Sequence, residues 1–149
     1  MTADEHWVAL VRGADRPGTL TALTSVFSSR GVSFDSLSTG SVDAGSGTIA
    51  VTFCASERRR TQLLRTVARL AEVRDVQVRR ADDPLVRAAA VVELPEGVRP
   101  PQVSGVLWAA GSGAGGAALA EGSLAAVRSA VSAALAAGAT TTATVVLGL

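Results

Sequence analysis

The stretch best suited to binding chemistry is a short turn that leads into an amphipathic pattern. Asp15, Pro17 and Gly18 stand directly before Leu20–Phe27, where apolar residues recur at helical spacing. A short acidic side chain can accept hydrogen bonds from the free N–H groups of a first helical turn, and proline is tolerated there. We therefore expect a helix over Pro17–Arg30, with Asp15 as its cap. Gly18 would leave its position in the first turn without a side chain.

Such a turn is suited to a ligand that carries both charges of an amino acid. Free N–H groups at a helix N-terminus, together with the helix dipole, attract a carboxylate. Gly18 would let that carboxylate approach the backbone, and Asp15 would accept the ammonium group. A plain capped helix start explains the turn alone equally well.

The other reactive side chains do not form a catalytic or metal site. His6 is the only histidine, and we expect it to be a surface residue of a strand. Cys54 lies between Phe53 and Ala55 in an apolar run, which predicts a buried and inert thiol. Because zinc needs three or four ligands, one histidine and one cysteine cannot bind it. The sequence thus predicts no catalytic residue, no metal and no cofactor.

A glycine-rich run at Gly111–Gly116, GSGAGG, invites a comparison with phosphate-binding loops. Such a loop needs Gly-Lys-Ser/Thr leading into a helix, and this chain has no lysine. We interpret the run as a flexible hairpin turn.

Arginines cluster in one short segment, at Arg58–Arg60, Arg65 and Arg69. The simplest interpretation is a solvated outer helix face, and the alternative is docking on an acidic patch of a partner protein. A formal net charge of +1 gives no argument for nucleic acid as a partner.

Composition is typical of a globular protein of the reducing cytoplasm. Of the 149 residues, 48% are hydrophobic, which is enough for a core, and the single cysteine excludes an internal disulfide framework. No stretch has the length and apolar character of a membrane span, and the acidic start, MTADEHW, lacks a signal-peptide core. We therefore expect a cytoplasmic protein with no membrane partner.

The N-terminal half predicts the element order βαββαβ. Two interlocked βαβ halves give an antiparallel sheet of order 4-1-3-2 with both helices on one face, a ferredoxin-like α+β fold. A turn cluster is expected at residues 43–47. The predicted strands are Trp7–Arg12, Val32–Ser41, Thr48–Ala55 and Val73–Arg79, and the predicted helices are Pro17–Arg30 and Glu57–Glu72, the second capped by Ser56.

An acidic hinge, Asp82–Pro84, leads into an Ala-, Gly- and Val-rich half that predicts β-loop-ββαβ. This order describes a degenerate ferredoxin-like domain whose first helix is replaced by the proline-rich segment Pro95–Gln102. We expect domains at 1–81 and 82–149. The strands are expected at Val86–Leu94, Val106–Ala110, Ala117–Glu121 and Thr140–Leu147, and a helix capped by Ser123 and stopped by Gly138 would bury Leu124, Val127, Val131 and Leu135.

Two segments, Asp15–Leu20 (DRPGTL) and Phe27–Leu37 (FSSRGVSFDSL), resemble the ACT domain, a small-molecule-sensing module. The likeness is greatest to the regulatory small subunit of acetolactate synthase. Its pattern is roughly Asn-Glu-(Pro/Ser)-Gly-(Val/Ala)-Leu, then Phe-Ser-x-Arg-Gly-(Tyr/Phe)-Asn-Ile-(Glu/Asp)-Ser-Leu. Asp15 and Ser33 stand where this family has Asn. The family also has a second ferredoxin-like domain, so the resemblance extends over the whole chain.

This resemblance implies an amino-acid-sensing regulatory subunit, without catalytic activity of its own. It implies a homodimer through the edge strand Val32–Ser41, a branched-chain amino acid as effector at the dimer contact, and a thiamine-diphosphate-dependent catalytic large subunit as partner. The alternatives are a free-standing ACT sensor for another amino acid and an interaction protein whose site has decayed. The effector-binding residues implied are Asp15, Arg16, Pro17, Gly18, Thr19, Leu20, Val32, Ser33 and Phe34.

Overall fold

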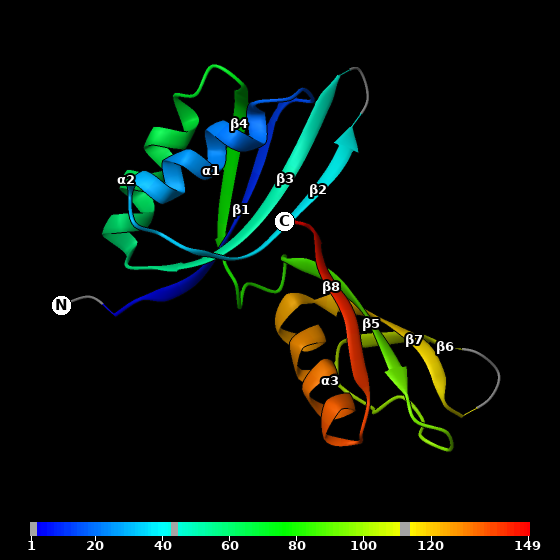
Figure 1. The fold of residues 1–149 in the computed structure, drawn as a ribbon. Coiled ribbons are helices and arrows are strands. Elements are labelled where there is room, and N and C mark those ends of the chain that lie inside the picture. Colours follow the sequence, from blue (N-terminus) through cyan, green and yellow to red (C-terminus); the bar gives the residue numbers. More distant parts are fainter. Residues whose placement is uncertain (1–2, 43–44, 111–113) are drawn as a thin grey trace. The chain divides into compact units, whose positions relative to one another are not determined.

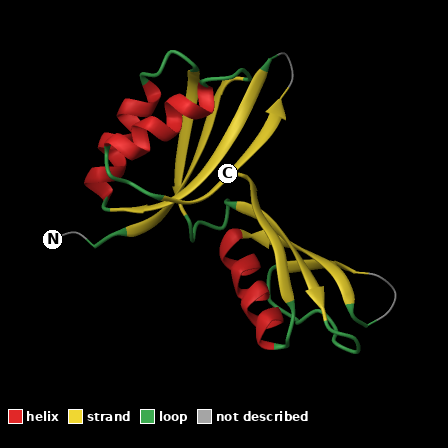
Figure 2. Ribbon diagram, in the orientation of Figure 1, coloured by secondary structure: helices red, strands yellow, loops and turns green. Residues whose placement is uncertain are grey.

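The structure is a computed structural model that describes residues 3–42, 45–110 and 114–149. The chain divides into two compact units, Met1–Ala81 and Asp82–Gly148 (Figure 1). Each unit contains its own four-stranded antiparallel sheet with helices on one face (Figure 2).

The first unit has the predicted βαββαβ order, and its sheet order, β2-β3-β1-β4, is the predicted one. Both helices cover the same face of this sheet (Figure 1). Asp43 and Ala44 of the predicted turn lie outside the described residues. The elements are β1 (Glu5–Ala14), α1 (Thr19–Ser29), β2 (Phe34–Val42), β3 (Ser46–Ala55), α2 (Glu57–Ala68) and β4 (Val73–Arg80).

The core between this sheet and its helices is mainly aliphatic and includes the buried rings of Trp7, Phe27 and Phe53. The ring of Phe27 on α1 meets Phe53 and Phe34 edge-on, with centroids 5.4 and 6.1 Å apart. Such edge-to-face pairs stabilise a core beyond the area that they bury. The buried indole of Trp7 donates its Nε1–H to the carbonyl oxygen of Ala55 at 2.9 Å, so its one polar atom is satisfied.

Two of the four helix ends in this unit follow the predicted signals. Gly31 has φ +63° and ends α1, with its N–H donating to the carbonyl of Ser28. Ser56 caps α2 by accepting from the N–H of Arg59. Because α2 ends at Ala68, residues 69–72 form the turn that leads into β4, not the last helical turn that was expected.

The second unit has the predicted β-loop-ββαβ order and the sheet order β6-β7-β5-β8, which confirms the degenerate ferredoxin-like fold. Residues 111–113 of the predicted glycine turn lie outside the described residues. The elements are β5 (Arg87–Leu94), β6 (Val106–Ala110), β7 (Gly116–Ser123), α3 (Leu124–Ala136) and β8 (Thr140–Gly148).

Loop residues take over part of the packing that a first helix would provide in this unit. Val98 of the loop and Trp108 of β6 pack on a core that contains Val92 and Ala134. The indole of Trp108 donates to the carbonyl of Pro101 at 2.8 Å, which ties the proline-rich segment to the sheet.

The predicted core of α3 is wrong at one position. Leu124 and Val127 are buried, and Val131 is partly buried against the core, but Leu135 is 48% exposed. The buried stripe is completed by Ala130 and Ala134 instead. At 3.6 residues per turn, Ala134 lies closer than Leu135 to the centre of the sheet-facing stripe. Helical spacing had pointed to Leu135, which follows Val131 by four residues.

Candidate functional site

The start of α1 differs from the predicted capped helix. Gly18 is the N-cap, with φ +98°, and no side chain caps the helix. Asp15 is therefore not the cap, and Pro17 and Gly18 precede the first helical turn. A Cβ on Gly18 would meet nothing within 4 Å, so it is the left-handed backbone, not crowding, that favours glycine there.

Hydrogen bonds fix the path of this loop on both sides. The hydroxyl of Thr19 donates to the carbonyl of Ala14 at 2.8 Å, and Thr19 is buried. The N–H of Asp15 donates to Gly45 in the β2–β3 turn, and the N–H of Ala14 donates to Glu72, each at 2.9 Å. The loop is thereby held before any ligand arrives.

A hollow of about 150 Å³ lies between this loop and the β2–β3 hairpin. We call it the β1–α1 hollow. Drug-sized ligands occupy pockets of roughly 300–1,000 Å³, so this volume suits a smaller molecule. It is lined by Gly13, Ala14, Asp15, Arg16, Thr19, Leu20, Thr39, Gly40, Gly47, Thr48 and Ile49.

Two oppositely charged side chains lie at this hollow. Asp15 and Arg16 are both exposed, and neither side chain makes a hydrogen bond or ion pair within the described part of the chain. The uncapped N-terminus of α1 adds positive potential beside them. The arrangement can hold an ammonium group on Asp15 and a carboxylate on Arg16 and the helix start, while Leu20 and Ile49 provide apolar contact.

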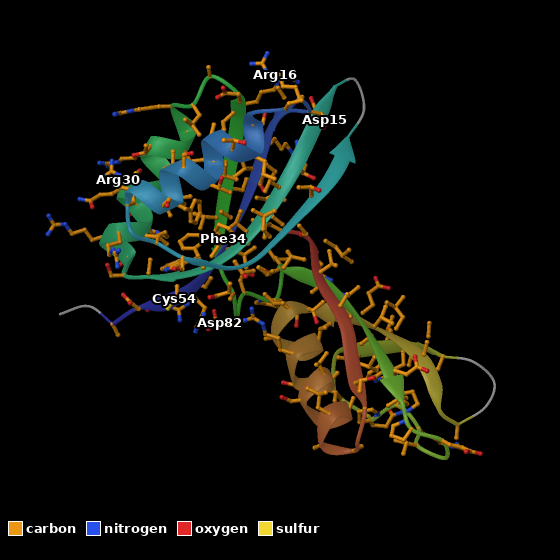
Figure 3. All side chains as sticks on the ribbon, in the orientation of Figure 1. Asp15, Arg16, Arg30, Phe34, Cys54 and Asp82 are labelled. Atoms are coloured by element: carbon orange, nitrogen blue, oxygen red, sulfur yellow. The ribbon has the colours of Figure 1, made fainter. Side chains whose placement is uncertain are left out.

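The predicted site residues fall into two places. Asp15, Arg16, Thr19 and Leu20 line the β1–α1 hollow, and the structure places Val32–Phe34 in another, more open hollow. α1, about 16 Å long at roughly 1.5 Å per residue, connects the two groups of residues along the chain, and residues of this helix line both hollows. Figure 3 shows Asp15 and Arg16 at one end of the first sheet and Phe34 far from them.

Sequence reasoning missed the hairpin side of the hollow, which comprises Thr39, Gly40 and Gly47–Ile49. Gly40 pairs with Thr48, and Thr39 pairs with Ile49, in the β2–β3 ladder. A hairpin register counted outward from the 43–47 turn would have brought these residues to the same end as Asp15.

Residues 7–72 match the family model of the ACT domain, which spans both loop segments and both helices of the first unit. The first unit is an ACT domain. No curated protein sequence matches the chain.

Two solved structures resemble the whole chain, at 16% identity each. The acetolactate synthase small subunit from Thermotoga maritima aligns with a TM-score of 0.65 over 97% of both chains. The ligand-free regulatory subunit of aspartate kinase from Thermus thermophilus aligns with a TM-score of 0.52 over 91% of this chain and 97% of its own. At this identity the likeness establishes a common fold.

His6 and Cys54 of the ACT domain are neighbours across the β1–β3 ladder. His6 is exposed, with Nδ1 3.7 Å from Oδ2 of Asp35. Cys54 is half-buried, so the predicted full burial is wrong. Loss of solvent, then the negative charges of Asp4 and Asp35, raise the pKa of its thiol. This favours the neutral, unreactive form. No group of three metal-ligating side chains occurs among the described residues.

The arginine run of the ACT domain is only partly solvated, in contrast to the simplest sequence interpretation. The guanidinium carbon of Arg60 lies 4.3 Å from the centroid of the Trp7 ring. Arg59 donates from Nη2 to the carbonyls of Arg30 and Gly31 at the end of α1, at 3.2 and 3.0 Å. Both side chains therefore help to hold α2 in place.

None of the helices in the described ranges combines the length and apolar character that a membrane crossing requires.

Proposed function

We propose that this protein is an amino-acid-binding regulatory subunit, and that its catalytic partner is an acetolactate synthase. One observation carries the proposal: a free carboxylate, Asp15, and a free guanidinium, Arg16, flank an uncapped helix N-terminus inside an ACT domain. The α-ammonium and α-carboxylate of an amino acid match these groups in charge. Charge-assisted hydrogen bonds of this kind contribute about 1.5–3 kcal/mol each.

The side-chain part of the hollow favours an aliphatic effector. Leu20 is 41% exposed at the rim, and Ile49 lies on the floor with 7% exposure. Thr39 and Thr48 complete this part of the lining, and among the described residues Asp15 and Arg16 are the only charged ones that line the hollow. A branched-chain amino acid would gain apolar contact there without leaving a polar group of its own unpaired.

A homodimer through β2 would complete the site. β2 is an edge strand, and Asp35 is its only charged residue. Antiparallel pairing of two copies places the start of one strand beside the end of the other. The partner subunit's Phe34 would then lie close to Thr39 and Gly40 of the hollow. One effector site would thus use both groups of predicted residues, Asp15–Leu20 from one chain and Val32–Phe34 from the other.

Calorimetric titration of the full chain with each of the twenty amino acids tests the effector. We expect valine, leucine or isoleucine to bind, and Asp15→Ala or Arg16→Ala to weaken binding at least tenfold, since 1.4 kcal/mol is a factor of ten. Glu96→Ala and Arg99→Ala remove the same charges from exposed positions of the second unit and serve as matched controls. Unchanged affinity in both hollow variants would place the ligand elsewhere.

The enzyme partner needs a separate experiment. The chain is mixed with an acetolactate synthase catalytic subunit of the same organism, and acetolactate formation is followed with and without the bound amino acid. We expect activity to change on mixing and to respond to the effector. Binding of an amino acid without any effect on the catalytic subunit would favour a free-standing sensor.

A further inference from the structure

Charge is distributed unevenly along this nearly neutral chain. Residues 57–80 hold eight of the fourteen arginines but only three of the thirteen acidic residues, a net charge of +5. The remaining residues together carry −4. This basic segment corresponds to α2 and β4, so one side of the ACT domain presents a positive surface. In Figure 3, nitrogen-tipped side chains project from that side, near the labelled Arg30.

An apolar groove of about 320 Å³ runs between α2 and β4 within this basic surface. Leu64, Val76 and Val78 are only partly buried in it, and Ala68 is exposed. We call it the α2–β4 groove. It is lined by Arg60, Thr61, Leu64, Arg65, Ala68, Val76 and Val78.

The arginines around the groove differ in how they are held. Arg60 is fixed by the Trp7 ring and lies 3.6 Å from Glu57. Its Nε is buried without a hydrogen-bond partner. Arg65 and Arg69 are exposed and make no ion pair or hydrogen bond within the described ranges. Free cations beside an apolar groove are a combination that an acidic, partly apolar partner would complement.

β4 is also the second edge of the first sheet, with β1 as its only partner strand in the described chain. An unpaired edge offers backbone N–H and C=O groups to an added strand. We propose that the α2–β4 groove and the β4 edge bind an extended acidic segment of a partner protein as an additional strand. Apolar side chains at alternate positions would enter the groove. Because successive side chains of a strand point to opposite faces, the acidic ones would lie on the other face of the sheet, attracted by the net charge of +5 of residues 57–80, to which Arg65 and Arg69 contribute.

Charge argues against a second copy of this chain on the same edge. Self-pairing would bring together two β4 strands that each carry Arg74, Arg79 and Arg80 against one acidic residue, Asp75, whereas β2 carries a single charge. Like charges placed across a strand pair are destabilising. Nucleic acid is disfavoured as well, because the groove lining contains no aromatic side chain on which a base could stack.

Fluorescence polarisation of a labelled peptide on the full chain tests this surface. The probe is EVELEVSG, which alternates acidic and apolar residues, and its control is EEEVVLSG, which has the same composition without the alternation. We expect the probe to bind at least tenfold more tightly than the control, and to protect the amides of β4, Val73–Arg80, from hydrogen exchange. No amino acid is added in this experiment. A failure of the peptide to bind therefore leaves the effector proposal unaffected, and a failure of amino acids to bind leaves the peptide proposal unaffected.

Variants separate the groove from general electrostatics. Arg65→Glu with Arg69→Glu should weaken probe binding at least tenfold, whereas Arg99→Glu with Arg128→Glu, an equal charge change on the second unit, should not. Ala68→Trp fills the groove and should also weaken binding, against Ala125→Trp on α3 as control.

Three results would overturn the proposal. They are equal affinity for the two peptides, protection on β2 with none on β4, and displacement of the probe by oligo(dT) at a comparable concentration.

Discussion

The two units have the same strand order but differ in what covers the sheet. In the ACT unit, α1 and α2 cover a core that contains the buried rings of Phe27 and Phe53, and the exposed ring of Phe34 meets Phe27 edge-on. The second unit has only α3, whose buried stripe includes Ala130 and Ala134, and its proline-rich loop replaces a first helix. The two units therefore form the same sheet topology with different amounts of apolar side chain.

This difference decides which unit presents a helix N-terminus beside a hairpin. The β1–α1 hollow lies between a helix N-terminus and the β2–β3 hairpin, and in the ACT unit that helix is α1. In the second unit the corresponding connection, residues 95–105, contains no helix. A helix dipole can therefore favour an anion at this place in the ACT unit only.

The largest expected effect comes from the aromatic core. Phe27 is 1% exposed, and a buried Phe→Ala typically costs about 3–5 kcal/mol. We expect Phe27→Ala to abolish most hydrogen-exchange protection in 5–80 while amides in 87–148 keep theirs. Equal loss of protection in both units would show that they unfold together and would contradict two independent domains.

A matched pair of leucines tests the core of the second unit. Leu124 is 1% exposed and Leu135 is 48% exposed on the same helix. Leu124→Ala should lower the free energy of unfolding by about 2–5 kcal/mol. Leu135→Ala should change it by about 0.5 kcal/mol or less. Urea denaturation of both variants measures the difference, and similar losses would mean that α3 packs through another face.

We expect Gly18 to affect the stability of the protein only through its left-handed backbone conformation. Gly18→Ala forces an L-residue into φ +98° in open space, at a cost of about 1–2 kcal/mol. Gly148→Ala also has open space, but its φ is not in the positive range, so it serves as control. Thermal melting of both variants should show a lower midpoint for Gly18→Ala only. No difference between them would mean that the loop relaxes.

The smallest effects are expected at the two serine caps, one in each unit. Ser56 accepts from Arg59 N–H at 3.3 Å, and Ser123 accepts from Ala126 N–H at 3.2 Å. Serine-to-alanine changes should each cost about 1 kcal/mol. Hydrogen exchange should place the Ser56→Ala effect in α2 and the Ser123→Ala effect in α3. An effect that spreads to the other unit would count against the division at Ala81.

Regular patterns in the sequence were enough to predict both sheets. The apolar run of β1, the β-branched residues of β3, glycine at Gly31 and serine caps at Ser56 and Ser123 are local signals, and the structure follows them. The start of α1 was not predicted, because a left-handed Gly18 cap and a Thr19 hydroxyl bonded to Ala14 depend on how the loop returns to the sheet.

The candidate site was predicted on one side only. Asp15–Leu20 stood out through residue type, but Thr48 and Ile49 are ordinary strand residues that reach the hollow through the β2–β3 register. Leu135 shows the same limit for packing, since helical spacing suggested burial and the position of the buried stripe on α3 decided against it.

Amide chemical-shift mapping of the ¹⁵N-labelled full chain, titrated with L-valine, L-leucine and L-isoleucine, tests the central claim most directly. We predict saturable shifts of residues 15–20 and of Thr39 and Thr48 around the β1–α1 hollow with at least one of these ligands. A β2-paired dimer adds residues 32–34, and signals of the second unit stay in place. Shifts confined to residues 87–148, or no saturable shift with any of the three, would contradict the account.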